Sequence, residues 1–480
     1  MSVASPPRSA PPRGGGAFAQ ERPMRRPDTS SPEVMTRRAW WLVVLNLLIP
    51  GSAQVLAGNR KLGRVGLAAT LTMWALVVVS LLVWALWRTL FLMVATHGVT
   101  LLIAQVLLVA YAVLWTVLTL DTLRLVRLVK ARPRARLPIA ALSIVGLVLA
   151  GGGAVYASQI TGTTRDTLGA IFGATGPTVP PSDGYYNILL LGADSGEGRD
   201  SMRFDSISVV SVNADTGAVT ITGIPRDMPH FPFAAGPMQE LYPDAHEGYE
   251  DDDCGWNSGI NQLRTEVEVC RDGDALYPEA TANHSSPGVE ATKDAAEGIL
   301  GIEIPYYVFI DMHGFAALID ALGGVDITVE ERLPMGGGPS YEGEPAEDWA
   351  IGWIEVGAQH MNGDTAQWYA RSRYTTSDFD RMKRQRQLQA AILAQFNPSN
   401  VLTRFNEVAA AGQAIVETDI PQSMLAYFVD LGLKAKEQPL QTIELTPEGG
   451  IDEYDPDYAY IRELVQSVLH PPTPTEAPEG

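Results

Sequence analysis

Cysteine is nearly absent from this chain, and so are the signatures of several common enzyme classes. Only two of the 480 residues are cysteines. No Cys-x-x-Cys or paired-histidine pattern accompanies them, which argues against a structural zinc site. The sequence also has no Walker-type loop, no dinucleotide fingerprint, no Gly-x-Ser-x-Gly elbow and no histidine-based triad. Enzymes that depend on those motifs are therefore excluded.

Positive charge is scarce beyond the first third of the chain. Residues 1–136 contain 17 Lys and Arg against 4 acidic residues, whereas the remainder contains 18 against 51, a balance of −33. A basic segment with apolar runs is typical of a membrane region beside the cytoplasm, and an acidic part of ordinary composition is typical of a folded domain elsewhere. So acidic a domain is not expected to bind nucleic acid.

Four apolar runs follow the N-terminus, at 40–57, 65–87, 99–120 and 137–157. The last three are long enough to cross a bilayer, at roughly 20 residues per span. The first is short and broken by Pro50-Gly51, which fits a short span, a re-entrant hairpin or an interfacial helix. Because the runs hold almost no charges and no other paired breaks, a transporter is not expected.

The basic loops set the orientation. The loops at 59–64 and 124–136 carry several Lys and Arg residues and should be cytoplasmic, so the fourth run leads outside. Three spans with a re-entrant first run keep the Arg-rich N-terminus inside, whereas four spans place it outside. The sequence therefore predicts a multi-pass protein of the cell membrane with an extracytoplasmic domain, and both counts fit it.

Composition divides the chain into five parts. We expect a disordered cytoplasmic N-terminus at 1–38, a membrane region of three or four helices at 39–158, a Gly/Thr/Pro/Ser-rich linker at 159–184, an exported domain at 185–470 with a polar, acidic surface insertion at 231–287, and a disordered tail at 471–480. In an oxidising space, Cys254 and Cys270 could close one loop of the insertion; the alternative is two unrelated thiols.

The exported domain alternates short apolar runs with helical patterns. Strands are predicted at 186–191, 206–212, 219–224, 306–310, 325–329 and 441–445. Helices are predicted at 313–322, 365–369, 381–395, 400–412, 421–433 and 458–469. This interleaving predicts a three-layer α/β domain, preceded by an all-α membrane region.

Six cations gather at 368–387, in a chain that is otherwise acidic. They are Arg371, Arg373, Arg381, Lys383, Arg384 and Arg386, and Asp378 and Asp380 lie among them. Alternate positions share one side of an extended segment, and positions three or four apart share one helix face, so several guanidinium groups are aimed at one place. Such planar groups suit a phosphate or pyrophosphate. The alternative is a solvated basic face.

Further charged residues flank the predicted strands, where α/β folds usually keep their sites. Asp194 follows the first strand, Arg203 and Asp205 precede the second, and Arg226 follows the third. We interpret Asp194 and Asp205 as ligands of one Mg²⁺ ion, which together with the arginines would bind a pyrophosphate. The alternative is that these charges only neutralise one another.

Several of these motifs, in this order, resemble the LytR-CpsA-Psr (LCP) phosphotransferases. The resemblance covers NILLLGAD at 187–194, the pair Arg203 and Asp205, IPRD at 224–227, the stretch 306–329, and 363–387 with its ARSR, DFDR and RQ. It implies a central mixed sheet flanked by helices and a groove that buries a polyprenyl tail. Asp194 and Asp205 match metal-linked carboxylates. The residues that match pyrophosphate-binding positions are Arg203, Arg226, Arg371, Arg373, Arg381 and Gln385. Arg386 departs from the family, which often has glutamine there.

The resemblance also implies an activity. Family members transfer a glycopolymer from a polyprenyl-pyrophosphate carrier to a hydroxyl of peptidoglycan, assisted by Mg²⁺, and leave a phosphodiester link. Asp205 or Asp194 would position or deprotonate that hydroxyl, and the sequence does not separate base from metal ligand. Two alternatives are a hydrolase of lipid-linked glycans and a non-catalytic membrane regulator that binds them.

Overall fold

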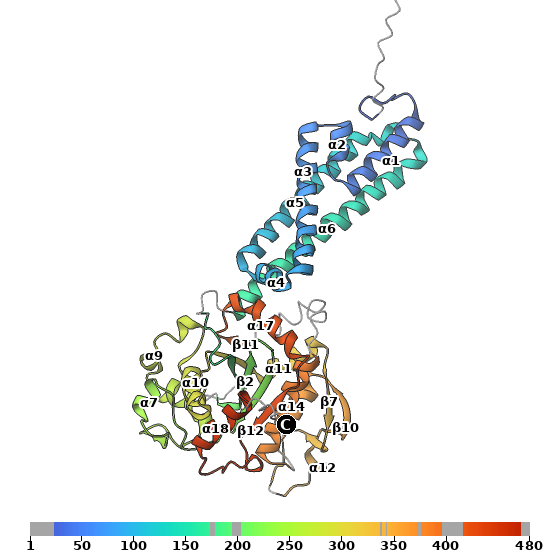
Figure 1. The fold of residues 1–480 in the computed structure, drawn as a ribbon. Coiled ribbons are helices and arrows are strands. Elements are labelled where there is room, and N and C mark those ends of the chain that lie inside the picture. The colour runs from blue at the N-terminus through green and yellow to red at the C-terminus, as the bar shows by residue number, and fades with distance from the viewer. Residues whose placement is uncertain are drawn as a thin grey trace, which may run out of the picture. The chain divides into compact units, whose positions relative to one another are not determined.

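A computed structural model describes residues 24–172, 178–193, 203–336, 338–341, 343–372, 376–395 and 416–471. The chain forms two compact units, one made of residues 1–82 with 104–159 and the other of residues 83–103 with 160–480. The first unit is helical, and the second is built around a β-sheet (Figure 1).

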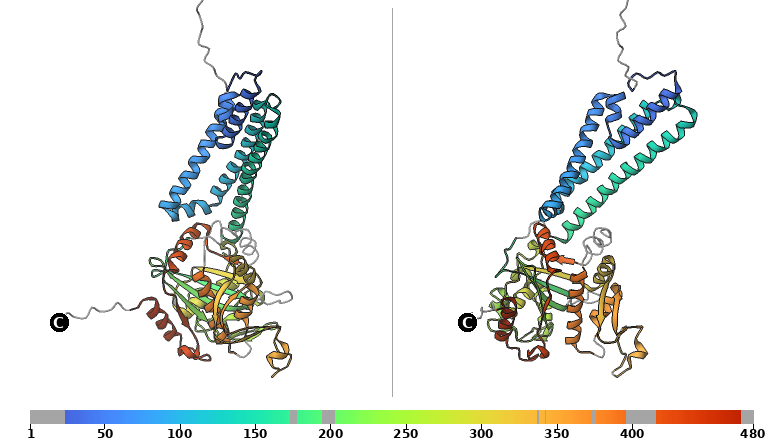
Figure 2. Two further views of the ribbon diagram at one scale, coloured as in Figure 1. Left: turned by 90° about the vertical axis from the view of Figure 1, so that its right-hand side faces the viewer. Right: turned by 45° about the vertical axis from the view of Figure 1, so that its right-hand side comes forward.

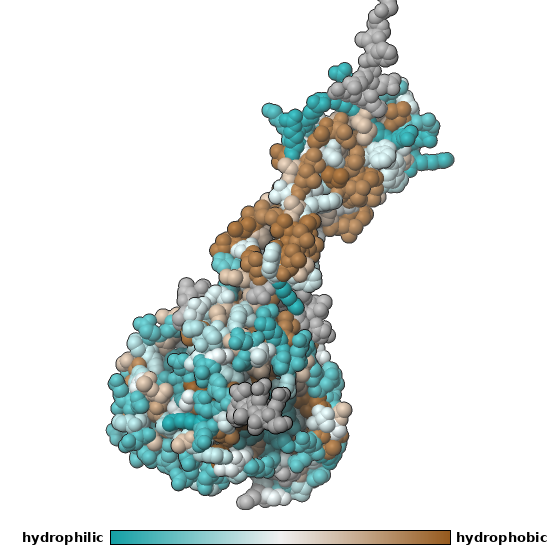
Figure 3. All heavy atoms as spheres, viewed as in Figure 1, coloured by the Kyte–Doolittle hydropathy of each residue, from teal (hydrophilic) through white to brown (hydrophobic). Residues whose placement is uncertain are grey.

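The helical unit consists of long apolar helices. It contains α1 (Pro32–Leu48), α2 (Ser52–Ala57) and most of α3 (Arg60–Leu86), α5 (Gly98–Val126) and α6 (Pro133–Ile171). On the face that Figure 3 shows, hydrophobic side chains predominate along the middle of these helices. In the described part of the chain, three helices are long and apolar enough to cross a bilayer, namely Arg60–Leu86, Gly98–Lys130 and Pro133–Ile171.

The first apolar run forms two helices that meet at a tight corner. Gly51 joins α1 to α2 with a φ of +94°, and a side chain at this position would collide with the backbone of α3. On α2, the fully buried Gln54 donates its side-chain amide to the carbonyl of Leu118 and to the hydroxyl of Thr122. The Pro50-Gly51 break therefore packs closely against the neighbouring helices.

The predicted linker at 159–184 is wrong in its first half, because α6 continues to Ile171. The Gly and Thr content of this stretch suggested a loop. Inside the helix, however, the hydroxyl of Thr164 donates to the carbonyl of Ile160 at 2.8 Å. Each of the two glycines in this part of the helix, Gly162 and Gly169, weakens it by only about 1 kcal/mol relative to alanine, which a helix of this length tolerates.

A six-stranded mixed sheet forms the centre of the second unit. Its strands are β1 (Tyr185–Ala193), β2 (Phe204–Asn213), β3 (Val219–Ile224), β6 (Tyr306–Asp311), β11 (Val416–Thr418) and β12 (Gln441–Glu444). They lie in the order β11-β6-β1-β2-β3-β12. β1 is parallel to β6 and β3 to β12, whereas the other neighbours are antiparallel. The predicted fold class is confirmed.

Helices and three small two-stranded sheets surround this sheet (Figure 2). The helices around the sheet are α7 (Pro237–Leu241), α8 (Leu263–Thr265), α9 (Gly273–Leu276), α10 (Pro287–Leu300), α11 (Met312–Leu322), α12 (Ala346–Trp349), α13 (Gly363–Arg371), α14 (Asp378–Gln395), α17 (Gln422–Ala435) and α18 (Tyr458–Leu469). The short helix α4 (Arg88–Thr96) belongs to the same unit and contacts α17, where Gln422 donates a hydrogen bond to the carbonyl of Thr96. The small sheets pair β4 (Gly248–Glu250) with β5 (Gly255–Asn257), β7 (Val325–Val329) with β10 (Gly357–Met361), and β8 (Leu333–Met335) with β9 (Gly352–Ile354). The predicted helix at 400–412 lies outside the described residues.

Both faces of the central sheet are covered. Side chains alternate along β1, so Leu189 packs into the main core with α10 and α18, whereas Tyr186 packs on the opposite face with α17. Leu393 of α14 joins that second cluster. Because both faces are buried, β1 reads as a continuous apolar run rather than an alternating one.

The segment 231–287 is not confined to the surface, contrary to the prediction. It places Phe231 and Leu263 in the main hydrophobic core, both fully buried. His246 and Glu266 are also fully buried, with His246 Nε2 3.0 Å from Glu266 Oε2. The exposed acidic run at 250–253 dominates the composition of this segment, which is why its apolar positions gave no sequence signal.

Glycine allows close packing of α11 and α13, and we expect Gly363→Ala to destabilise the domain. A Cβ on Gly363 would collide with the carbonyl oxygen of Ala316 on α11, so the two helices would have to separate. We expect a loss of about 1–3 kcal/mol, as for other overpacked sites. The thermal unfolding of the full-length protein in detergent measures the effect.

Gly432→Ala provides the matched control. Gly432 lies in α17, and no atom lies within 4 Å of the position that its Cβ would occupy. This substitution should leave the midpoint unchanged or raise it, because alanine favours a helix by up to about 1 kcal/mol. Equal midpoints for the two variants would contradict the packing described for α11 and α13.

Candidate functional site

Four side chains of alternating charge meet where β2, β3 and α14 come together. Asp205, near the start of β2, forms an ion pair with Nη1 of Arg226, which follows β3. Asp378, the first residue of α14, lies between two arginines: its Oδ2 is 3.0 Å from Arg381 Nη2 and 3.9 Å from Arg226 Nε. Segments far apart in the sequence thus converge on one charged cluster, made of Asp205, Arg226, Asp378 and Arg381.

Burial strengthens these ion pairs. The side chain of Arg381 is only 4% exposed and that of Arg226 is 19% exposed. Burial alone would lower the pKa of Arg226, but the nearby carboxylates of Asp227, Asp378 and Asp205 outweigh burial and raise that pKa. Both guanidinium groups are therefore held as cations with fixed partners.

An apolar cavity of about 420 Å³ lies beside the cluster, between the central sheet and α14. Its lining includes Leu190 and Val210 from the sheet and Leu388 and Ile392 from α14. It approaches the charged cluster at Gln385, which lies one helical turn beyond Arg381 on α14. An empty apolar space of this size is unusual in a packed core, where few voids exceed a water molecule.

The arginine-rich stretch does not aim all of its cations at one place. Arg384 donates to the carbonyls of Tyr369 and Ser372, and the Gln385 amide donates to the carbonyl of Ala370 at 3.2 Å. These groups satisfy the last carbonyls of α13, which a helix end otherwise leaves unpaired. Arg384 is buried, which lowers its pKa. Lys383 pairs with Glu330 at the surface.

The other predicted site residues are placed as follows. Arg203 is exposed just before β2. Arg371 ends α13, with its guanidinium carbon 5.8 Å from the centroid of the Trp368 ring. Asp194 and Arg373 lie outside the described residues.

Arg386, which stands where the family often has glutamine, has a structural role in this chain. Its side chain is 3% exposed and forms an ion pair with Glu444 of β12. Glu444 is the cross-strand partner of Gly223 on β3, and the Arg386 guanidinium occupies the space where a Cβ of Gly223 would lie. Arg386 therefore fastens α14 to the edge of the sheet and does not point at the charged cluster.

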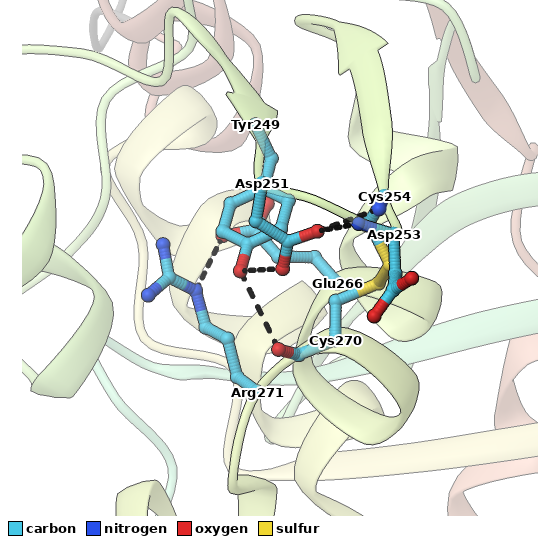
Figure 4. The surroundings of a disulfide bond; sticks show 7 residues. All are labelled: Tyr249, Asp251, Asp253, Cys254, Glu266, Cys270 and Arg271. Carbon is cyan, nitrogen blue, oxygen red and sulfur yellow. Dashed lines mark hydrogen bonds and ion pairs between the residues drawn. A yellow bond between two sulfur atoms is a disulfide. The ribbon is translucent and has the colours of Figure 1, made fainter.

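Cys254 and Cys270 form a disulfide. Around it, Asp251 Oδ1 accepts hydrogen bonds from the backbone N–H groups of Asp253 and Cys254, and Arg271 Nε donates to Glu266 Oε1 at 2.9 Å (Figure 4). The disulfide closes a loop of the segment 231–287.

Sequence reasoning missed the roles of Asp378 and Glu444. Asp378 precedes Arg381 by three residues, which is an ion-pair spacing in a helix, but the predicted helix began only at 381, whereas α14 begins at Asp378. Its contact with Arg226 joins residues more than 150 positions apart, and no local pattern predicts such a contact. The pairing of Arg386 with Glu444 likewise required the position of β12.

Carboxylate oxygens, as in the charged cluster, are the kind of ligand that Mg²⁺ takes. Among the described residues, no three His, Cys, Asp or Glu side chains form a metal-binding group. In phosphate sites, however, Mg²⁺ usually takes only one or two carboxylates and completes its shell with phosphate oxygens and water. Asp205 and Asp378 are 24% and 31% exposed and both contact Arg226, whereas Asp194, the other predicted metal ligand, lies outside the described residues.

These observations define an α/β domain with a charged cluster at the edge of an apolar cavity. A model of the LytR_cpsA_psr family matches residues 162–230 and 268–467, more than half of the chain. The protein belongs to this family. The match skips 231–267, which lies within the segment 231–287.

Known proteins are similar over the same region. The polyisoprenyl-teichoic acid–peptidoglycan teichoic acid transferase TagU of Bacillus cereus (strain AH820) is 26% identical over 295 residues, which is 59% of this chain and 79% of TagU. The crystal structure of TagV from B. subtilis has 22% identity and a TM-score of 0.39, covering 60% of this chain and 98% of TagV. Protein gbs0355 of Streptococcus agalactiae has 21% identity and a TM-score of 0.41, covering 59% of this chain and 88% of that one.

The role of Arg386 predicts that Gly223→Ala destabilises the domain. The new methyl group would displace the guanidinium and break its ion pair with Glu444, leaving a buried charge without a partner. We expect a loss of about 2–4 kcal/mol in the free energy of unfolding. Chemical unfolding of the full-length protein in detergent measures it.

A second substitution tests the cause. In Gly223→Ala/Arg386→Gln, the shorter neutral side chain removes the collision, so part of the lost stability should return. If the double variant is less stable than Gly223→Ala alone, the collision is not the cause.

Proposed function

We propose that this protein transfers a glycopolymer from a polyprenyl-pyrophosphate carrier to peptidoglycan, forming a phosphodiester link. The members of this family are phosphotransferases, and the similar protein TagU is named as a polyisoprenyl-teichoic acid–peptidoglycan teichoic acid transferase. The observation that carries the proposal is the adjacency of the charged cluster to the apolar cavity. An amphiphile with an anionic diphosphate head and an isoprenoid tail matches both parts.

We further propose that the domain from residue 185 to 470 lies outside the cell and that the long apolar helices anchor it in the bilayer. Three helices of sufficient length and the basic loops between them support this arrangement. The donor and the acceptor then both lie on the outer side of the membrane.

In the proposed reaction, arginines hold the diphosphate and the cavity holds the tail. Arg226 and Arg381, with Arg203, Arg371 and Arg373, would neutralise the phosphate charge, which is greatest as the carrier phosphate leaves. An acceptor hydroxyl forms the new P–O bond at the glycan-linked phosphorus. The bridging P–O bond breaks, and the polyprenyl phosphate leaves with its electron pair.

The hydroxyl proton passes to a carboxylate, for which Asp205 and Asp194 are the candidates. Asp205, with Asp194 or Asp378, would hold Mg²⁺, and the bound ion would supply further positive charge at the diphosphate.

The test is transfer by the full-length protein in detergent, with a polyprenyl-pyrophosphate-linked glycan and peptidoglycan. We expect a phosphodiester-linked product, and we expect a chelator to abolish its formation. Release of glycan to water at the same rate with and without acceptor would instead identify a hydrolase. Donor binding without turnover would identify a binding protein.

Arg381→Ala should lower the transfer rate by on the order of a hundredfold, because one electrostatic group is lost where charge develops. Lys383→Ala is the matched control, since Lys383 lies on the same helix but pairs with Glu330 at the surface. It should change the rate less than about twofold. Arg371→Ala is a second test, because Arg371 lies on α13 and its replacement leaves the sequence of α14 unchanged. Undiminished transfer in both arginine variants would reject the proposed site.

A further inference from the structure

Asn261 lies in the part of the chain that the family model does not match, and it contacts the charged cluster through Asp227. Its backbone N–H donates to the carbonyl of Arg226 at 2.9 Å. Its side-chain Nδ2 donates to Asp227 Oδ1, also at 2.9 Å. Asp227 Oδ2 in turn lies 3.2 Å from Arg226 Nε. One asparagine thus holds both the backbone and, through a carboxylate, the side chain of a cluster arginine.

Arg226 needs such support because it lies in a turn. Arg226 and Asp227 occupy the middle of a turn closed by the hydrogen bond from Met228 N to the carbonyl of Pro225. The Asp227 side chain is 66% exposed and would rotate freely without a partner. Asn261 supplies a partner from a fixed position.

The position of Asn261 is fixed by packing. Its neighbour Ile260 and the nearby Leu263 are fully buried in the main core, and Asn261 itself is 4% exposed. The disulfide between Cys254 and Cys270 closes the loop around it. The asparagine therefore cannot follow Asp227 if that side chain moves, so it acts as an anchor.

We propose that Asn261 is a positioning residue for Arg226. It holds the Asp227 carboxylate so that Arg226 Nε is directed toward Asp227 while Nη1 faces Asp205. The contact is a property of the fold; its catalytic importance rests on the proposed function of Arg226 in binding the diphosphate. The segment 231–267, which lies outside the family match, thus helps to position Arg226 through Asn261.

The first test does not depend on activity. An arginine-specific reagent, phenylglyoxal, is applied to the full-length protein in detergent, and modification of Arg226 is followed by peptide mass spectrometry. Asn261→Ala should raise the modification rate of Arg226 by about three- to tenfold, because a hydrogen bond to a charged group is lost. The exposed Arg332 serves as the internal reference and should not change.

Asn257→Ala is the matched control. Asn257 lies in the same disulfide-closed loop but is exposed. It should leave the reactivity of Arg226 unchanged. Equal rates for the wild type and Asn261→Ala, or equal increases in both asparagine variants, would overturn the proposal. Asn261→Asp keeps the shape but opposes two carboxylates, so it should also increase the reactivity if Asn261→Ala fails to fold.

The second test asks whether Asn261 acts through Asp227. Asn261→Ala should lower the transfer rate about tenfold in the wild type, but less than about twofold in an Asp227→Ala background, since residues that act as a unit are not additive. Full additivity would overturn the proposal. If the wild type shows no transfer while the reactivity of Arg226 responds as expected, the proposed function fails and the positioning role stands.

Discussion

The ion pair between Asp205 and Arg226 is the contact on which the site depends. It joins the start of β2 to the turn after β3, and Asp378 extends it to α14. A guanidinium group cannot lose its proton in a protein, so a partly buried arginine needs acceptors for its N–H groups, and for Arg226 these are carboxylates. Once Arg226 is enclosed at this point, the positions of Asp205, Asp378 and Asp227 are all constrained by the need to neutralise it.

The same constraint bears on the cavity. A helix that packs directly on a sheet leaves no space for a ligand. α14 is instead fastened by polar contacts: Asp378 with Arg226 near its start, Arg386 with Glu444 at the sheet edge, and Gln389 Nε2 with the hydroxyl of Ser208 at 3.1 Å. These contacts set the separation of helix and sheet, so the apolar side chains between them need not meet. The cavity can therefore persist without collapse of the core.

Much of the fold was predictable because its strands are short apolar runs bounded by turns. β1, β3 and β7 match their predicted ranges closely, as does α18. The site was predictable in part: Asp205, Arg226 and Arg381 do converge. The uses of Arg384 and Arg386 were not, because whether a guanidinium caps a helix or pairs with a distant strand depends on tertiary contacts. The burial of part of the segment 231–287 was not predicted, because a few exposed acids outweighed core residues such as Phe231 and Leu263 in its composition.

Because the charged cluster is electrically neutral, its four residues alone are not enough to bind an anion. Asp205, Arg226, Asp378 and Arg381 contribute two negative and two positive charges, so the cluster has no net attraction for an anion. Under the proposed function it must nevertheless hold a diphosphate that carries about two negative charges. The proposed function therefore also requires the other arginines that match the family's pyrophosphate-binding positions, Arg203, Arg371 and Arg373, and a divalent cation. Under that proposal the neutral cluster fixes the geometry, while these further positive charges supply the affinity.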